Sequence, residues 1–131
     1  MAQPKPEKPK QPRVLLIDDD QFIVDMYVLK FNEEKFLIET ARDGKEGLGK
    51  VKQFNPDVIL LDIVMPVMDG FQMLEELRKD TKPWKVILLT NLGQKEDVER
   101  GMRLGANDYV VKAHFTPSEV VEKVRRIAGI Q

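Results

Sequence analysis

The sequence lacks cysteine altogether, has one histidine, and contains no long hydrophobic run. The absence of cysteine excludes a disulfide framework, a thiolate zinc site, an iron–sulfur cluster and a thiol nucleophile. The single histidine, His114, argues against a metal site built from several imidazoles. The longest aliphatic runs, such as residues 58–61, are too short to cross a bilayer, and the N-terminus has no apolar secretory signal. We therefore expect a soluble, cytoplasmic protein with no membrane contact.

Charge of one sign is not in excess either, because 21 lysine and arginine residues face 22 aspartate and glutamate residues. A protein that binds nucleic acid through its phosphates usually carries a clear basic excess. We therefore expect no direct nucleic acid binding. The length of 131 residues suits one domain that buries a core of its own.

Proline is concentrated at one end of the sequence. Residues 1–12 contain four of the eight prolines, interspersed with lysine, and almost no apolar side chain. Such a composition cannot bury enough apolar surface to fold. We expect residues 1–12 to form a disordered, Pro/Lys-rich tail and residues 13–131 to form the folded domain.

Beyond the tail, short aliphatic segments alternate five times with longer amphipathic segments, which is typical of βαβ units and a parallel sheet. The most apolar segments, residues 58–61 and 86–89, are expected to be central strands that helices cover on both faces. The pattern predicts an α/β fold of three layers, doubly wound around the sheet. The predicted strands are residues 13–17, 36–40, 57–62, 85–90 and 107–111. The predicted helices are residues 20–32, 44–54, 69–79, 94–104 and 116–128.

Two predicted helices differ in the strength of their local signals. The last helix starts with Thr116 as N-cap, Pro117 at the first helical position and Glu119 as partner in a capping box. The second helix contains Gly47 and Gly49, each of which costs about 1 kcal/mol relative to alanine inside a helix. We expect the last helix to be well defined and the second to be mobile.

Acidic and polar residues follow four of the predicted strands. The first strand runs into Asp18–Asp20 and the third into Asp62. The fourth ends in Thr90, and Lys112 follows the fifth. The carboxyl ends of parallel strands meet at one edge of a sheet, where carboxylates at close range repel one another unless a cation lies among them. Oxygen ligands without histidine or cysteine favour a hard ion, and Mg²⁺ matches best because it needs few carboxylates.

The same residues suit the transfer of a phosphoryl group. Charge on the phosphoryl oxygens must be neutralised, which the metal, the Lys112 ammonium and the Thr90 hydroxyl would do. Asp62, the lone acid after the most apolar strand, would attack phosphorus and become an aspartyl phosphate. Taken singly, these residues are ordinary, since Asp20 is also a typical helix cap and Lys112 a typical solvated charge. Their joint placement on four strand ends favours the functional interpretation.

An ordered set of short segments runs through the folded part of the sequence: residues 14–20 (VLLIDDD), 60–66 (LLDIVMP), 69–70 (DG), 86–90 (VILLT), 105–109 (GANDY) and Lys112. Through these segments the sequence resembles, from Arg13 to about Ala128, the receiver domains of bacterial two-component response regulators. The resemblance implies a flavodoxin-like fold with a five-stranded parallel sheet of order 2-1-3-4-5 and five helices.

The resemblance also implies roles for the acidic residues. Asp62 would accept a phosphoryl group from a sensor histidine kinase or a phosphotransfer protein. Mg²⁺ would be held by Asp19, Asp62 and the main-chain carbonyl of Val64, with Asp18 acting mainly through water. A domain of this kind catalyses only its own phosphorylation and slow dephosphorylation and is not otherwise an enzyme.

Other residues would carry the signal. Lys112 would contact the phosphoryl oxygens, Thr90 would turn inward to hydrogen-bond the phosphate, and Tyr109 would move from an outward to an inward position. The signal would leave through the face made by the fourth helix, the fifth strand and the fifth helix. The downstream target is expected to be a protein, and the domain to be a monomer or a dimer promoted by phosphorylation. On its own, Tyr109 would be interpreted as an aromatic residue on an edge strand.

Two residues depart from the pattern of the family. Asn91 follows the switch hydroxyl, where the family normally has a small residue, and Ala113 replaces the proline that usually follows the lysine. Asn91 is expected either to crowd the phosphoryl group or to contact it. Ala113 removes the usual reason for a cis peptide bond, so we predict that the Lys112–Ala113 bond is trans.

Two other functions compete with a phosphoacceptor. A magnesium-dependent phosphohydrolase with an aspartate nucleophile usually has a second acid two residues later, where this sequence has Val64. The second is that of a degenerate receiver that only binds a partner, and the departures from the family pattern at Asn91 and Ala113 leave this alternative open. His114 is interpreted as a surface residue rather than a phosphorelay histidine. The chain is expected to act by protein contact alone or to be one piece of a longer regulator.

Overall fold

The computed structural model describes residues 11–91 and 95–130. A short 3-10 helix, which the sequence pattern did not predict, spans Lys112–His114. The strands are β1 (Arg13–Ile17), β2 (Leu37–Ala41), β3 (Val58–Asp62), β4 (Val86–Thr90) and β5 (Asp108–Val111). The α-helices are α1 (Gln21–Glu33), α2 (Gly44–Phe54), α3 (Gly70–Arg78), α4 (Lys95–Arg103) and α5 (Pro117–Ala128).

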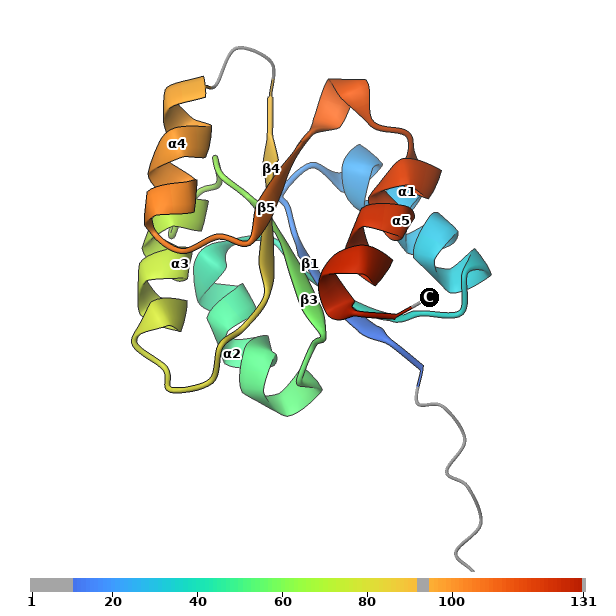
Figure 1. Ribbon diagram of the computed structural model, residues 1–131, viewed down its shortest axis with the longest axis horizontal. Coiled ribbons are helices and arrows are strands. Elements are labelled where there is room, and N and C mark those ends of the chain that lie inside the picture. Colours follow the sequence, from blue (N-terminus) through green and yellow to red (C-terminus); the bar gives the residue numbers. More distant parts are fainter. Residues whose placement is uncertain (1–10, 92–94, 131) are drawn as a thin grey trace, which may run out of the picture.

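The five strands within the described ranges form one parallel sheet of order β2-β1-β3-β4-β5. Helices α1 and α5 cover one face of the sheet, and α2, α3 and α4 cover the other (Figure 1). This arrangement confirms the predicted three-layer, doubly wound α/β fold and the strand order that the resemblance implied. No helix in the part of the chain that the structure describes is long and apolar enough to span a membrane.

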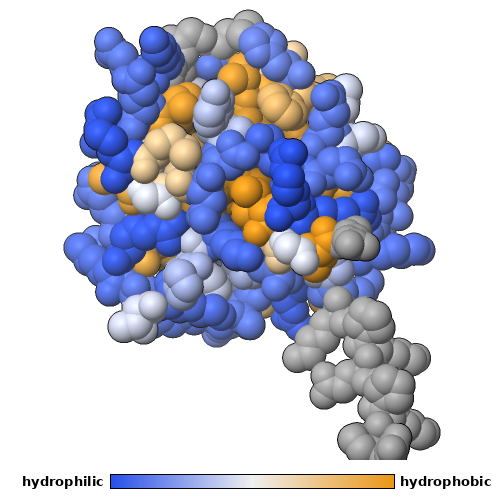
Figure 2. Space-filling model, in the orientation of Figure 1, coloured by the Kyte–Doolittle hydropathy of each residue, from blue (hydrophilic) through white to orange (hydrophobic). Residues whose placement is uncertain are grey.

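The sheet divides the hydrophobic core into two halves, because side chains along a strand alternate between its faces. On β1, Leu15 and Ile17 belong to the half that α2 and α3 cover. Val14 and Leu16 belong to the half that α1 and α5 cover. Every residue of β3 and β4 is buried, as predicted for central strands. The face shown in Figure 2 is mainly hydrophilic, with its hydrophobic residues in small separate groups.

Several predicted boundaries are wrong by one residue. The second strand was predicted to begin at Phe36, but β2 begins at Leu37. Phe36 instead packs its ring edge-on against Phe31, with 5.0 Å between the ring centroids. The predicted first and third helices each included the residue that caps the helix, Asp20 and Asp69 respectively. Because a cap has extended backbone angles, it lies just outside its helix.

The N-termini of α1 and α5 have the predicted caps. The Phe22 N–H donates to Asp20 Oδ1 over 3.0 Å. The Glu119 N–H donates to Thr116 Oγ1 over 3.2 Å, and the Thr116 N–H donates to Glu119 Oε1 over 3.0 Å, which completes the predicted capping box. These bonds define where the two helices begin after β1 and β5.

Gly47 and Gly49 occupy different environments in α2, although both weaken the helix by intrinsic propensity. A Cβ atom on Gly47 would lie 2.6 Å from Ile17 Cδ1, so the absence of a side chain lets α2 approach β1. No atom from the elements packed around α2 lies within 4 Å of the Cβ position of Gly49. Gly47 therefore has a packing role, while the mobility expected of α2 remains a prediction.

Substituting each glycine with alanine tests this difference. Gly49→Ala should raise the free energy of unfolding by about 0.5–1 kcal/mol, because alanine loses less backbone entropy than glycine when the helix forms. Gly47→Ala should lower it by about 1–2 kcal/mol, because the added methyl group overpacks the contact with Ile17. Urea denaturation of both variants beside the wild-type protein measures the two values. Equal stabilisation by both substitutions would contradict the packing role of Gly47.

Candidate functional site

The register of β1 and β3 places two aspartates side by side. Ile17 pairs with Leu61 across the parallel strands, and the next residues along the chain are Asp18 and Asp62. Both are buried, with 1% and 5% of their surfaces exposed. The sheet therefore brings two acidic groups to one point at its carboxyl edge, as the sequence predicted.

The register of β4 and β5 brings Thr90 and Lys112 to the same edge. Thr90 ends β4 and pairs with Val111, which ends β5 and is followed directly by Lys112. Lys112 Nζ lies 2.8 Å from Asp18 Oδ2 and 3.3 Å from Asp62 Oδ1. The Lys112 ammonium group thus bridges the two buried acids.

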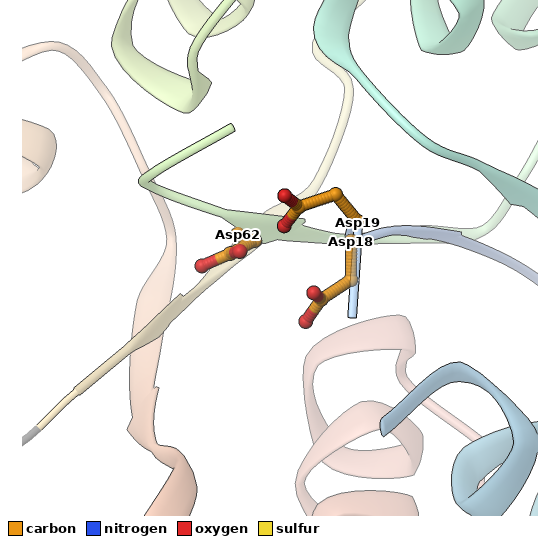
Figure 3. Close-up of side chains that lie close together, drawn as sticks. All are labelled: Asp18, Asp19 and Asp62. Carbon is orange, nitrogen blue, oxygen red and sulfur yellow. The ribbon is translucent and has the colours of Figure 1, made fainter. Parts of the chain in front are cut away.

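Asp19 completes an acidic cluster with Asp18 and Asp62. Each of the three residues has a carboxylate oxygen within 4.8 Å of an oxygen of the other two. Asp18 and Asp19 extend to opposite sides of the end of β1, and Asp62 lies beside them at the end of β3 (Figure 3). The structure thus brings together the three aspartates that were predicted to hold a metal ion.

The Asp62 carboxylate is poorly stabilised. Burial and then the charge of Asp18 raise the pKa of Asp62 to about 7, with a smaller contribution from Asp19 and an opposing one from Lys112. Burial by itself would lower the pKa of Lys112, but its interactions with Asp18 and Asp62 outweigh burial and raise that pKa. Lys112 therefore remains an ammonium ion, and this single charge does not balance three neighbouring carboxyl groups.

One buried oxygen of Asp18 lacks a hydrogen-bond donor, so the cluster can accept further positive charge. Asp18 Oδ1 accepts a hydrogen bond from the Asp20 N–H over 2.9 Å. The buried Asp18 Oδ2 has no hydrogen-bond donor aligned with it in the described structure, although Lys112 Nζ is near. Three carboxylates that offer oxygen ligands at short mutual distances fit a hard divalent cation such as Mg²⁺.

The cluster lines a surface pocket of about 730 Å³. Val64 and Asn91, which the sequence analysis singled out, also line the pocket. Ile23 lines it too, but was not predicted because an apolar residue at helical spacing indicates core packing. The acidic cluster therefore opens to the surface of the molecule. The lining residues of the pocket are Asp18, Asp19, Asp20, Ile23, Asp62, Val64, Asn91, Lys112 and Ala113.

Thr90 and Tyr109 lie near the edge of the sheet but are not among the residues that line this pocket. The Thr90 side chain is buried, and its hydroxyl donates to the main-chain oxygen of Asn91 over 3.2 Å. Tyr109 lies on the edge strand β5 with 40% of its surface exposed. The outward position expected of Tyr109 is thus observed, while its inward movement and that of Thr90 stay predictions.

The connection between β5 and α5 has a trans peptide bond after Lys112. No cis peptide bond occurs in the described residues, so the prediction for Lys112–Ala113 is confirmed. The 3-10 helix at Lys112–His114 turns the chain toward α5. His114 is exposed, which confirms its interpretation as a surface residue.

The loop between β3 and α3 is held tightly against Asp62. The Gly70 N–H donates to the Ile63 carbonyl oxygen over 2.9 Å, and a Cβ atom on Gly70 would overlap the Asp62 carbonyl oxygen. Glycine alone permits this approach. Val67, in the same loop, is exposed and has a left-handed φ of 66°, which is a strained conformation for a β-branched residue. The Asp69–Gly70 turn was recognised from the sequence, whereas nothing in the sequence indicated the strain at Val67.

Known proteins match this chain over most of its length. A family model described as the response regulator receiver domain matches residues 14–125. The chemotaxis protein CheY of Halobacterium salinarum is 31% identical over 106 residues, which cover 81% of this chain and 88% of CheY. The receiver domain of the Francisella response regulator 1452 has a TM-score of 0.83 at 35% identity, covering 91% of this chain and 98% of that domain.

Other relatives are longer than this chain. The DNA-binding dual master transcriptional regulator RpaA of Synechocystis is 37% identical over 118 residues, which cover 88% of this chain and 48% of RpaA. The chain therefore spans about half the length of such relatives. The similarity to RpaA therefore says nothing about the other half of that protein.

Replacing Asp62 with asparagine tests whether its charge opposes folding. Without divalent cations, folded Asp62 retains its proton up to about pH 7, whereas the unfolded chain releases it near the ordinary pKa of 3.8. The wild-type protein therefore loses stability as the pH rises from about 4 to 7, and Asp62→Asn does not share this loss. The stabilisation by Asp62→Asn should grow by about 2–3 kcal/mol between pH 5 and pH 8.

Urea denaturation in EDTA at both pH values measures this growth. Asp25→Asn is the matched control, because it removes the same charge from an exposed position on α1. The effect of Asp25→Asn on the free energy of unfolding should be nearly the same at the two pH values. Equal stabilisation by Asp62→Asn at both pH values would show that the Asp62 pKa is not raised.

Proposed function

The chain belongs to the response regulator receiver domain family, and from this membership we propose that Asp62 is its phosphoacceptor. The observation that most supports the proposal is the position of Asp62 within the cluster, where Asp18 and Asp19 lie on one side and Lys112 Nζ is 3.3 Å away. A carboxylate beside a lysine and a cation-binding pair of acids has the surroundings that a nucleophile in phosphoryl transfer needs.

Asp18, Asp19 and Asp62, together with the main-chain carbonyl of Val64, would hold Mg²⁺. The bound ion would supply positive charge to the phosphoryl oxygens. Once the repulsion among the three aspartates is relieved, the pKa of Asp62 falls and its carboxylate is ionised at neutral pH. An Asp62 oxygen would then form a bond to phosphorus while the bond from phosphorus to the donor's leaving group breaks and its electron pair stays with the leaving group, so that Asp62 would carry an acyl phosphate.

Lys112 and Thr90 would change partners on phosphorylation. The Lys112 ammonium would leave Asp62 and contact a phosphoryl oxygen. The Thr90 hydroxyl would give up its hydrogen bond to the Asn91 carbonyl oxygen and donate instead to a second phosphoryl oxygen. Tyr109 would then turn from its exposed position toward Thr90 and change the face formed by α4, β5 and α5.

The phosphoryl group would come from a sensor histidine kinase or a phosphotransfer protein in the cytoplasm, and the altered face would bind a protein target. RpaA is named as a DNA-binding regulator, but this chain aligns with only 48% of it. The matched residues 14–125 are a receiver domain, and we assign them no contact with nucleic acid. The domain would act as a monomer or as a dimer promoted by phosphorylation.

Both alternative functions have less support. A phosphohydrolase would need an acid at Val64, whose apolar side chain is 65% exposed in the pocket. A degenerate receiver would not need the contacts of Lys112 with Asp18 and Asp62, which are present. A phosphoacceptor uses every one of these groups.

Incubation with Mg²⁺ and phosphoramidate should add one phosphoryl group to the protein, detected by intact mass spectrometry. Asp62→Asn should remain unmodified, because the amide is not a nucleophile toward phosphorus. Asp25→Asn should be modified like the wild-type protein. Continuous release of inorganic phosphate at a steady rate would indicate a phosphohydrolase, and no modification of the folded wild-type protein would indicate a degenerate receiver.

Magnesium should stabilise the folded domain at neutral pH. At a hundred times the dissociation constant, the gain should be about 2.7 kcal/mol, because the ion binds only the folded cluster. Asp19→Asn should reduce the gain, since it removes an exposed ligand and leaves the buried Asp18, Lys112 and Asp62 in place. Urea denaturation with and without Mg²⁺ measures the gain, with Asp25→Asn as the control. If Mg²⁺ stabilises Asp19→Asn as much as it stabilises the wild-type protein, Asp19 is not a ligand of the ion.

A further inference from the structure

A second groove lies between α2 and α3, near the end of the sheet where the strands begin. The two helices run side by side on one face of the sheet (Figure 1), and the connection from α3 to β4 completes the lining. The groove has a volume of about 440 Å³. None of its lining residues belongs to the acidic pocket, and Asp62 lies at the opposite end of β3. The groove is therefore a separate feature of the domain.

The floor of this groove is apolar and fixed in place. Val51, Leu77 and Trp84 are buried, while Leu48 packs against the same half of the core and stays partly exposed. The Trp84 ring N–H donates to Asp80 Oδ2 over 3.2 Å, which holds the ring in one orientation. A partner would therefore meet a surface that is already ordered, and binding would cost little conformational entropy in the floor.

The two carboxylates that line the groove already have donors within the domain. Glu76 Oε1 accepts a hydrogen bond from Lys79 Nζ over 2.8 Å. Asp80 Oδ1 accepts from the Lys82 N–H over 3.2 Å, and Asp80 Oδ2 accepts from Trp84. These hydrogen bonds to Asp80 lower its pKa, because they stabilise the ionised form. Neither acid needs a further cation from a partner.

Two ammonium groups beside the groove have no carboxylate partner. Neither Lys52 nor Lys82 forms an ion pair with any residue that the structure describes. Lys52 lines the groove from the last turn of α2 and is exposed. Lys82 Nζ lies 4.2 Å from the centroid of the Trp84 ring and donates to the Asn55 side chain. The edge of the groove thus carries positive charge that the domain does not neutralise.

We propose that the groove is a docking site for a protein segment that presents an aliphatic side chain flanked by carboxylates. The aliphatic side chain would contact Leu48 and cover the apolar floor, and the carboxylates would pair with Lys52 and Lys82. This site would bind its partner independently of phosphorylation, because it shares no residue with the acidic pocket.

A nucleic acid fits the groove less well than an acidic protein segment. The Trp84 ring is buried, so no base can stack on its face. Glu76 and Asp80 would repel a phosphate backbone laid along the groove. An aliphatic side chain needs neither a stacking partner nor a continuous basic surface.

Trp84 is the only tryptophan in the sequence, so tryptophan fluorescence reports on the groove itself. The probe is a capped synthetic peptide in which single leucines are separated by pairs of glutamates. This peptide should change the fluorescence in a saturable way. Replacing its leucines with serine should weaken binding about tenfold, because the contact with the apolar floor is lost.

Charge reversal on the protein tests the contact with the carboxylates. Lys52→Glu should weaken binding of the leucine peptide about fivefold, because it replaces an attractive charge with a repulsive one. Lys85→Glu is the matched control, since Lys85 is an exposed lysine that also follows α3. Its neighbours Trp84 and Val86 belong to the half of the core that α2 and α3 cover, so Lys85 points to the other face of the sheet. Lys85→Glu should change the affinity less than about twofold.

Several outcomes would overturn the proposal: no saturable fluorescence change, equal affinity for the leucine and serine peptides, or equal weakening by Lys52→Glu and Lys85→Glu. A single-stranded oligothymidylate, titrated by calorimetry, should not bind. If it binds more tightly than the leucine peptide and Lys52→Glu weakens it, the groove is a nucleic acid site instead. The leucine peptide should bind Asp62→Asn as well as it binds the wild-type protein, so failure of this proposal and failure of the proposed function are distinguishable.

Discussion

Repulsion among Asp18, Asp19 and Asp62 is the constraint on which the properties of this domain depend. Two of the three carboxyl groups are buried, and a single ammonium group, that of Lys112, lies between them. A flexible chain would separate these groups, but the buried strands β1 and β3 hold them in place. The packing energy of the sheet therefore maintains an arrangement that electrostatics alone would disperse. Ionisation of Asp62, and the cation binding and phosphoryl transfer proposed for the cluster, would all respond to this one imbalance.

The sequence predicted much of the fold because the relevant signals are local. Continuous apolar segments indicated β3 and β4, and the capping box at Thr116 indicated the start of α5. The site was predictable because parallel strands end at one edge, so residues just after them must converge. The error at Phe36 arose because a buried aromatic residue just before a strand has the same hydrophobicity as one inside it.

The features that sequence reasoning missed depend on distances between elements. Nothing near Gly47 in the sequence indicates that its Cβ position meets Ile17. Ile23 has the spacing of a core residue, and its place in the pocket follows from the position of α1 relative to β3. The left-handed φ of Val67 contradicts its residue type, so it is set by the loop that closes on Asp62. The roles proposed for Thr90 and Tyr109 would belong to a second conformation, which neither sequence periodicity nor one structure describes.

The pairing of Ile17 with Leu61 has an evolutionary consequence. Because Asp18 and Asp62 meet only when the two strands keep this alignment, an insertion or deletion of one residue inside β1 would turn every later side chain of that strand to the opposite face. The acidic edge of the sheet is therefore far less tolerant of length changes in its strands than of altered side chains around its rim. Lineages that inherit this domain are free to diversify the residues that surround the acids, while the number of residues within each strand stays constant.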